Sequence, residues 1–106
     1  MRAQSPKRRR EVPARRQVVR DMLDRYPTCQ IDGPYCTGRS ECVHERRKRS
    51  SNGSILTYRN LVACCVRCNG WVEDYPLAAS ISKTRDGRSL VVREGDPEWP
   101  QLGRNA

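Results

Sequence analysis

The residues whose types and spacing point most directly to chemistry are the six cysteines of this chain. Cys65 and Cys68 form a C-x-x-C turn, the spacing that lets two thiolates bind one ion from a tight knuckle. A second pair must complete a tetrahedral site, and Cys29 and Cys36 bracket a loop with a Gly-Pro turn that is able to present both sulfurs. We therefore predict one Zn²⁺ ion bound by Cys29, Cys36, Cys65 and Cys68.

Two other ligand sets stay open at the level of the sequence. Cys36 could pair with Cys42, and Cys64 could replace Cys65. In the favoured set Cys42 and Cys64 are left over, either as small buried hydrophobes or as a strand-to-strand disulfide. Because four thiolates leave no open coordination position, we expect a structural ion whose binding is part of folding.

The only histidine, His44, lies between the two cysteine pairs and is followed by Glu45, while Asn69 directly follows the second pair. A nitrogen of His44 and an oxygen of Asn69 on one divalent cation, Mg²⁺ or Mn²⁺, would leave water positions open. Such a cation suits phosphodiester hydrolysis. Glu45 is then a candidate to accept a proton from the attacking water.

Positive charge is concentrated in two places, within a net charge of +9. The first 20 residues hold eight Arg or Lys against one Glu, and a second basic run directly follows Glu45. Because neutralising phosphates releases counterions, this placement favours DNA as the partner over a merely solvated tail and loop. The predicted phosphate contacts are Arg46, Arg47, Lys48 and Arg49 beside the site, and Arg8, Arg9 and Arg10 in an N-terminal arm.

The elements that must position these residues follow from hydrophobic spacing. Val19, Met22, Leu23 and Tyr26 form one helical stripe, which predicts a helix from Pro13 that stops at Pro27. We further predict antiparallel strands at 42–44 and 61–64, a short helix at 68–75, another helical turn at 77–81 and a strand at 90–92. The predicted organisation is a disordered basic arm (1–12), a single domain (13–95) and an extended tail (96–106) pinned by Trp99.

Size and composition agree with a metal-stabilised domain. A chain of 106 residues with 36% hydrophobic residues and no Phe has too little core to hold a fold without help from a metal, disulfides or a partner. It contains no apolar stretch of about 18 residues and no secretory signal, so no membrane association is expected. Without export, cysteines are expected to bind metal rather than to form disulfides.

Taken in order, the motifs resemble the HNH endonucleases of the His-Me finger group, closest to small zinc-knuckle forms of actinobacterial phages. The resemblance covers about residues 27–76, and its motifs are Cys29-x6-Cys36-Thr37-Gly38, Val43-His44-Glu45, Asn60-Leu61 and Cys65-x-x-Cys68-Asn69-x-Trp71-Val72. It implies a small α+β fold, with a ββα-metal core stapled by the four-cysteine zinc site and preceded by a helix. It also implies DNA cleavage that leaves a 5′-phosphate and a 3′-hydroxyl.

The family roles transfer to three positions of this chain. His44 matches the first metal ligand, Asn69 matches the last, and Asn60 matches the central Asn, which constrains the loop by hydrogen bonding. Glu45 is a departure, because most members have a His there as general base. A carboxylate with an ordinary pKa of about 4.3 is a weaker base at neutral pH than histidine. The alternative is that Glu45 binds the metal and that another group acts as the base. Sliding the motif to make His44 the base would put Val43 at a ligand position, which valine cannot fill.

We therefore expect a metal-dependent DNA endonuclease. The alternative is a catalytically degenerate zinc-knuckle DNA-binding module, supported by the missing second His. A transcription-regulating zinc finger fits poorly, because no basic recognition helix follows the knuckle. The phage resemblance implies work in the bacterial host cytoplasm, in genome packaging beside the terminase subunits, in homing or in host restriction.

Overall fold

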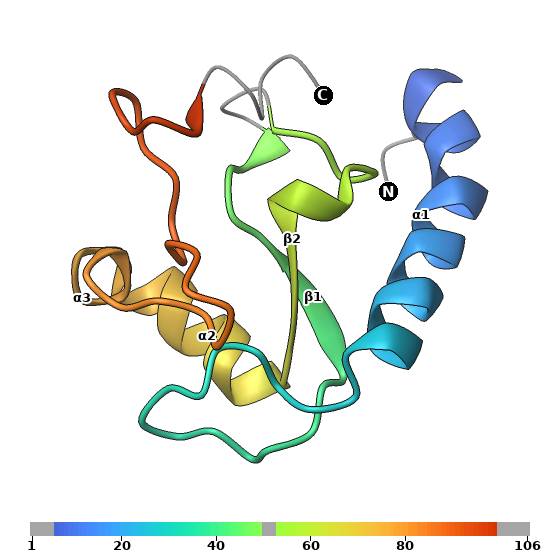
Figure 1. Ribbon diagram of the computed structural model, residues 1–106. Helices are drawn as coiled ribbons and strands as arrows, with labels where there is room; N and C mark the ends of the chain where they lie inside the picture. Colours follow the sequence, from blue (N-terminus) through green and yellow to red (C-terminus); the bar gives the residue numbers. More distant parts are fainter. Residues whose placement is uncertain (1–5, 50–52, 100–106) are drawn as a thin grey trace.

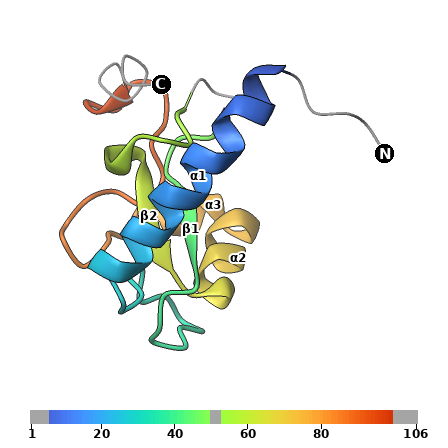
Figure 2. The ribbon, with the colours of Figure 1, turned by 90° about the vertical axis from the view of Figure 1, so that its right-hand side faces the viewer.

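The computed structural model describes residues 6–49 and 53–99. In chain order its elements are α1 (Pro6–Arg25), β1 (Cys42–Glu45), the 3-10 turn η2 (Tyr58–Asn60), β2 (Leu61–Cys64), α2 (Val66–Asp74) and α3 (Pro76–Ser80). The two strands form a hairpin at the centre, with α1 along one side and α2 with α3 on the other (Figures 1 and 2). The predicted small α+β class with a two-stranded antiparallel sheet is confirmed.

The register of the hairpin decides which side chains face which helix. Cys42 lies opposite Cys64 and His44 opposite Val62. Because successive side chains of a strand point to opposite faces, Val43 joins Met22 of α1 in one hydrophobic cluster. Val62 and Cys64 instead belong to the cluster around α2. His44 shares their face and therefore points toward α2.

Helix α1 packs through the predicted stripe but begins earlier than predicted. Met22 is fully buried against the sheet, and the other three residues of the stripe pack around it. The helix begins at Pro6, so residues 6–12 are helical, and their assignment to a disordered arm is wrong. Arg and Lys are good helix formers and a proline fits the first turn, so the basic run extends the helix toward the N-terminus. Residues 1–5 of the predicted arm lie outside the described residues.

The C-terminal segment differs most from the sequence prediction. Asp86 and Gly87 form the expected turn, with an isolated bridge between Lys83 and Ser89. The predicted strand at 90–92 does not form. Instead the backbone of this segment meets the chain just after β1, where the N–H of Val92 donates to the carbonyl of Arg46 (3.1 Å). Residues 96–98 form turns rather than an extended tail, and 100–106 lie outside the described residues.

The short helices follow the prediction closely. α2 begins at Val66, two residues before the predicted start, because Cys65 caps it by accepting the N–H of Cys68. Pro76 lies just after the end of α2 and occupies the first turn of α3. No helix of the described residues is long and apolar enough to cross a membrane.

Candidate functional site

Four cysteine sulfurs converge on one point at the base of the hairpin. The Sγ atoms of Cys29, Cys36, Cys65 and Cys68 all lie within 4.8 Å of one another. A tetrahedral ion with Zn–S bonds of about 2.3 Å needs sulfurs about 3.8 Å apart, so the group fits a Zn²⁺ ion. This confirms the predicted four-cysteine metal group. The alternative sets with Cys42 or Cys64 are wrong, because neither residue belongs to the group.

Local backbone geometry brings the first pair to the second. Gln30, beside Cys29, pairs with the outer edge of β2: its N–H donates to Ala63 (2.8 Å) and its side-chain oxygen accepts from Ala63 (2.9 Å). The loop that follows crosses α2 at Gly33. A Cβ there would lie 3.0 Å from the Trp71 ring and 3.5 Å from the Cys68 sulfur, so the close approach favours glycine.

Backbone N–H groups point at the sulfurs and favour thiolate charge. The donor–sulfur pairs are Gly33 to Cys68 (3.3 Å), Thr37 to Cys65 (3.5 Å), Gly38 to Cys36 (3.3 Å) and Cys68 to Cys65 (3.3 Å). Burial opposes ionisation of Cys65, but the hydrogen bonds from Thr37 and Cys68 outweigh it and lower the pKa of Cys65 to about 6. Burial raises the pKa of both Cys36 and Cys68. For all four sulfurs to be thiolates this close together, a bound cation would have to balance their charge.

A second cluster of polar side chains lies between β1 and α2. The Nδ1 atom of His44 is 3.2 Å from the Oδ1 atom of Asn69 and 3.7 Å from the Oε1 atom of Glu73. The two predicted ligands, His44 and Asn69, are thus brought together. Glu73 is the residue that sequence reasoning missed. Its spacing of four residues from Asn69 puts both on one helix face, and this signal could have identified it.

The environment of His44 keeps its imidazole neutral. The side chain is 4% exposed, and burial lowers its pKa, although Glu73 and Asn69 act in the opposite direction. A neutral imidazole has a free lone pair, which metal binding or proton acceptance requires. Its Nε2 atom is buried with no hydrogen-bond partner among the described residues.

Glu45 does not belong to this cluster. It lies on the opposite face of β1, and its carboxylate is 3.7 Å from the guanidinium of Arg15 on α1. Arg15 also donates to the carbonyl of Ile55 (3.2 Å). The prediction that Glu45 activates water at His44 disagrees with this geometry, because adjacent strand residues cannot face the same side. Glu45 instead joins α1 to the hairpin.

Asn60 holds the hairpin loop, as predicted for the central Asn. Its fully buried side chain accepts from the N–H of Arg47 (2.8 Å) and donates to the carbonyls of Arg47 (2.9 Å) and Ser54 (2.7 Å). These hydrogen bonds go to the loop backbone and not to His44 or Asn69. Its role is therefore to fix the chain that leaves β1.

The first two residues of the basic run after β1, Arg46 and Arg47, are less accessible to DNA than predicted. Arg46 is 3% exposed and donates to the carbonyls of Ser89 and Arg59 (both 2.8 Å) and to Glu98. Arg47, 5% exposed, donates to the carbonyl of Trp99 (2.7 Å), and its guanidinium stacks 3.3 Å from the centre of the Trp99 ring. The phosphate contacts predicted for these two arginines therefore disagree with their burial. Trp99 contacts Arg47, in agreement with a chain held at that residue, and the rest of the predicted tail from residue 100 lies outside the described residues.

For the other basic residues, contact with DNA phosphates stays a prediction. Lys48 is exposed and forms an ion pair with Glu73, so it lies at the edge of the His44 cluster. Arg49 is half-buried. Arg8, Arg9 and Arg10 lie in the first turns of α1, and their side chains are outside the described part.

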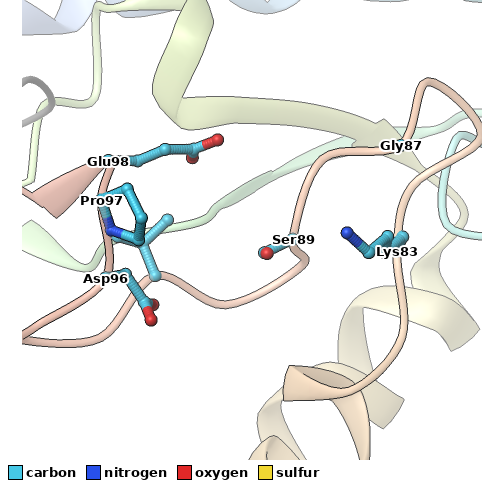
Figure 3. Close-up of a pocket in the computed structure, with 7 residues that line it drawn as sticks. Lys83, Gly87, Ser89, Asp96, Pro97 and Glu98 are labelled. Carbon is cyan, nitrogen blue, oxygen red and sulfur yellow. The ribbon is translucent and has the colours of Figure 1, made fainter.

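A separate pocket lies in the C-terminal segment. Lys83, Ser89, Asp96 and Glu98 are among the residues that line it (Figure 3). It borders the partners of Arg46 but includes none of the predicted zinc, cation or catalytic residues. We therefore assign the candidate site to His44, Asn69 and Glu73 rather than to this pocket.

No family model matches this chain, and no curated protein or solved structure is similar to it at a significant level. The resemblance to HNH endonucleases therefore stays a prediction from the motif residues of the sequence.

Proposed function

We propose that this protein is a metal-dependent endonuclease of the HNH type that hydrolyses phosphodiester bonds in DNA. The observation that carries the proposal is the convergence of His44, Asn69 and Glu73 from β1 and α2. The proposal is supported by the element order β1, β2, α2, which is the order that a ββα-metal core requires. The four-cysteine group also connects the loop before β1 to the start of α2. A histidine nitrogen, an amide oxygen and a carboxylate form a donor set suited to Mg²⁺ or Mn²⁺.

The chemistry of the cluster fits one divalent cation. His44, Asn69 and Glu73 would hold it, and a bound cation would neutralise charge on the phosphate and acidify a water molecule. Burial keeps His44 neutral and ready to bind. Glu73 is partly exposed, so the cluster is open on the side where Lys48 lies. Lys48 is placed to contact a phosphate that docks there.

We assign the carboxylate of the site to Glu73 and not to Glu45. Glu73 lies beside His44, whereas Glu45 is directed toward Arg15 on the other face of the strand. Glu73 could serve as a ligand or accept the proton of the attacking water. In both cases its charge is needed, whereas Glu45 contributes only to the contact between α1 and the hairpin.

The test is a nicking assay with supercoiled plasmid and Mg²⁺ or Mn²⁺. We expect wild type and Glu45→Gln to nick the plasmid, and His44→Ala, Asn69→Ala and Glu73→Gln to lose at least about 100-fold in rate, as removal of a metal ligand or catalytic base does. Loss of activity in Glu45→Gln with retention in Glu73→Gln would reverse the assignment of the carboxylate.

The second candidate is a DNA-binding module without catalysis. It is favoured by the burial of His44 and by the ion pair that Lys48 makes with Glu73, which occupies that carboxylate. A wild-type protein that binds DNA but nicks none with either cation would establish this function instead. The terminase subunits proposed as partners would be tested by co-purification with the full chain.

A further inference from the structure

Two cysteines remain outside the four-cysteine group, and they lie against each other. Cys42 and Cys64 are directly opposite in the register of β1 and β2. Their sulfurs are 3.8 Å apart, and the Cys42 thiol also donates to the carbonyl of Cys64 (3.4 Å). Both are free thiols. The pair thus lies across the hairpin, next to the zinc ligands but not among them.

The backbone already has the separation that a disulfide needs. Opposed residues of an antiparallel pair have Cα atoms about 4.5–5.5 Å apart, within the range of about 4.4–6.8 Å found for disulfides. The sulfurs would have to approach by about 1.8 Å to reach the bonded distance of about 2.05 Å. Side-chain rotation with a small backbone adjustment supplies a movement of this size.

Access differs between the two thiols. Cys42 is half-buried, whereas Cys64 is fully buried under the hydrophobic cluster beside α2. A dissolved disulfide can therefore reach Cys42 first. Cys64 is already in contact with that sulfur, so it can complete an exchange without exposure to solvent.

We propose that Cys42 and Cys64 form a redox-modification site, at which exchange with a low-molecular-weight disulfide such as glutathione disulfide creates a cross-strand disulfide. The Cys42 thiolate attacks one sulfur of glutathione disulfide, forming a mixed disulfide and releasing one glutathione thiolate. The Cys64 thiolate then attacks the Cys42 sulfur and displaces the second glutathione. In total, two protein thiols are oxidised, one glutathione disulfide is reduced to two glutathione molecules, and both thiol protons pass to the products.

The cross-link would join the strand that carries His44 to the strand that follows Asn60. It would close the loop between residues 42 and 64, which contains the whole basic run and the Asn60 contacts. The hairpin would then be held covalently in addition to the zinc site. A protein that meets oxidants would keep this hairpin when zinc is removed.

The test treats the zinc-loaded full chain with glutathione disulfide and follows free thiols, bound zinc and intact mass. We expect loss of two thiols with zinc retained, and a Cys42–Cys64 linked peptide after proteolysis. Cys42→Ser should lose no thiol pair. Cys64→Ala should instead hold glutathione on Cys42, because the resolving thiol is absent; Cys42→Ala replaces the serine variant if that one does not fold.

Three results would overturn the proposal. One is thiol loss that proceeds in step with zinc release, which would put the oxidised sulfurs in the four-cysteine group. Another is wild type that keeps glutathione on Cys42 without forming the cross-link. The third is a wild type that loses no thiols under conditions in which a reduced model dithiol is fully oxidised. None of these readouts depends on nuclease activity.

Discussion

Replacing the two asparagines of the candidate motif by alanine should affect different properties, stability for one and activity for the other. Asn60 is fully buried and makes three hydrogen bonds to the loop backbone, whereas Asn69 is half-buried and contacts the side chain of His44. We predict that Asn60→Ala mainly lowers the free energy of unfolding. Asn69→Ala should mainly abolish nicking.

The expected size follows from the contacts. Each hydrogen bond of Asn60 contributes about 1 kcal/mol net, and the replacement removes all three of these side-chain contacts from a buried loop backbone. Together these effects should lower the free energy of unfolding by about 3–4 kcal/mol. With a urea slope of about 1.5 kcal/mol/M, the midpoint should fall by roughly 2 M.

For Asn69 the same reasoning gives a small effect on stability. One contact with His44 is lost, and alanine has the higher helix propensity in α2, so the free energy of unfolding should change by less than about 1 kcal/mol.

Urea titration of the zinc-loaded proteins, followed by tryptophan fluorescence, measures stability, and plasmid nicking with Mn²⁺ measures activity. An Asn60→Ala protein within about 1 kcal/mol of wild type would refute the hydrogen-bond reasoning. An Asn69→Ala protein that nicks at the wild-type rate would remove Asn69 from the site while leaving the account of Asn60 intact.

Three further predictions concern the loop, the zinc site and pH. Gly53→Ala should be strongly destabilising, because its Cβ would lie 1.8 Å from the carbonyl oxygen of Arg47, whereas Gly70→Ala, with nothing within 4 Å, should leave the urea midpoint unchanged or raise it. Removal of zinc by a chelator should unfold the protein, with loss of the far-UV helix signal and recovery on adding Zn²⁺; a zinc-free protein that keeps its signal would contradict the coupling of zinc to folding. Burial lowers the pKa of His44 in the folded state. The contribution of this group to stability should therefore be complete above the unfolded pKa of about 6.5 and be lost as the pH falls through the folded pKa. Urea midpoints measured from pH 8 to pH 5 should show this dependence, and His44→Gln should reduce it.

Features set by local spacing could be predicted from the sequence. The C-x-x-C turn caps α2, and the short continuous apolar run Leu61–Cys64 predicted the bounds of β2, because both depend on neighbours within a few residues. The choice of Cys29 as a member of the metal group also succeeded, although the contact that places it is not local. The adjoining Gln30 bonds to Ala63 at the edge of β2, 33 residues away, and brings that cysteine to the second pair.

Other features depend on contacts far apart in the chain. Arg46 and Arg47 look like exposed cations in the sequence, but partners 52 residues away bury them, and no local pattern indicates a guanidinium held by Glu98 or Trp99. Glu45 is a different case. The alternation of a strand already excludes His44 and Glu45 from one face, so this error could have been avoided from the sequence.

The position of the candidate site explains why a metal-stabilised fold suits it. A two-stranded hairpin is marginal by itself, and here its loop end is fixed by Asn60 and its open end by the four-cysteine group. Cys68 is followed directly by Asn69, so the zinc ligand and the proposed cation ligand share one helical turn. His44 is fixed independently, by its place in β1. A zinc ion bound by the four cysteines would therefore set the distance between the two sides of the cluster, and the proposed chemistry would depend on a structural ion that takes no part in it.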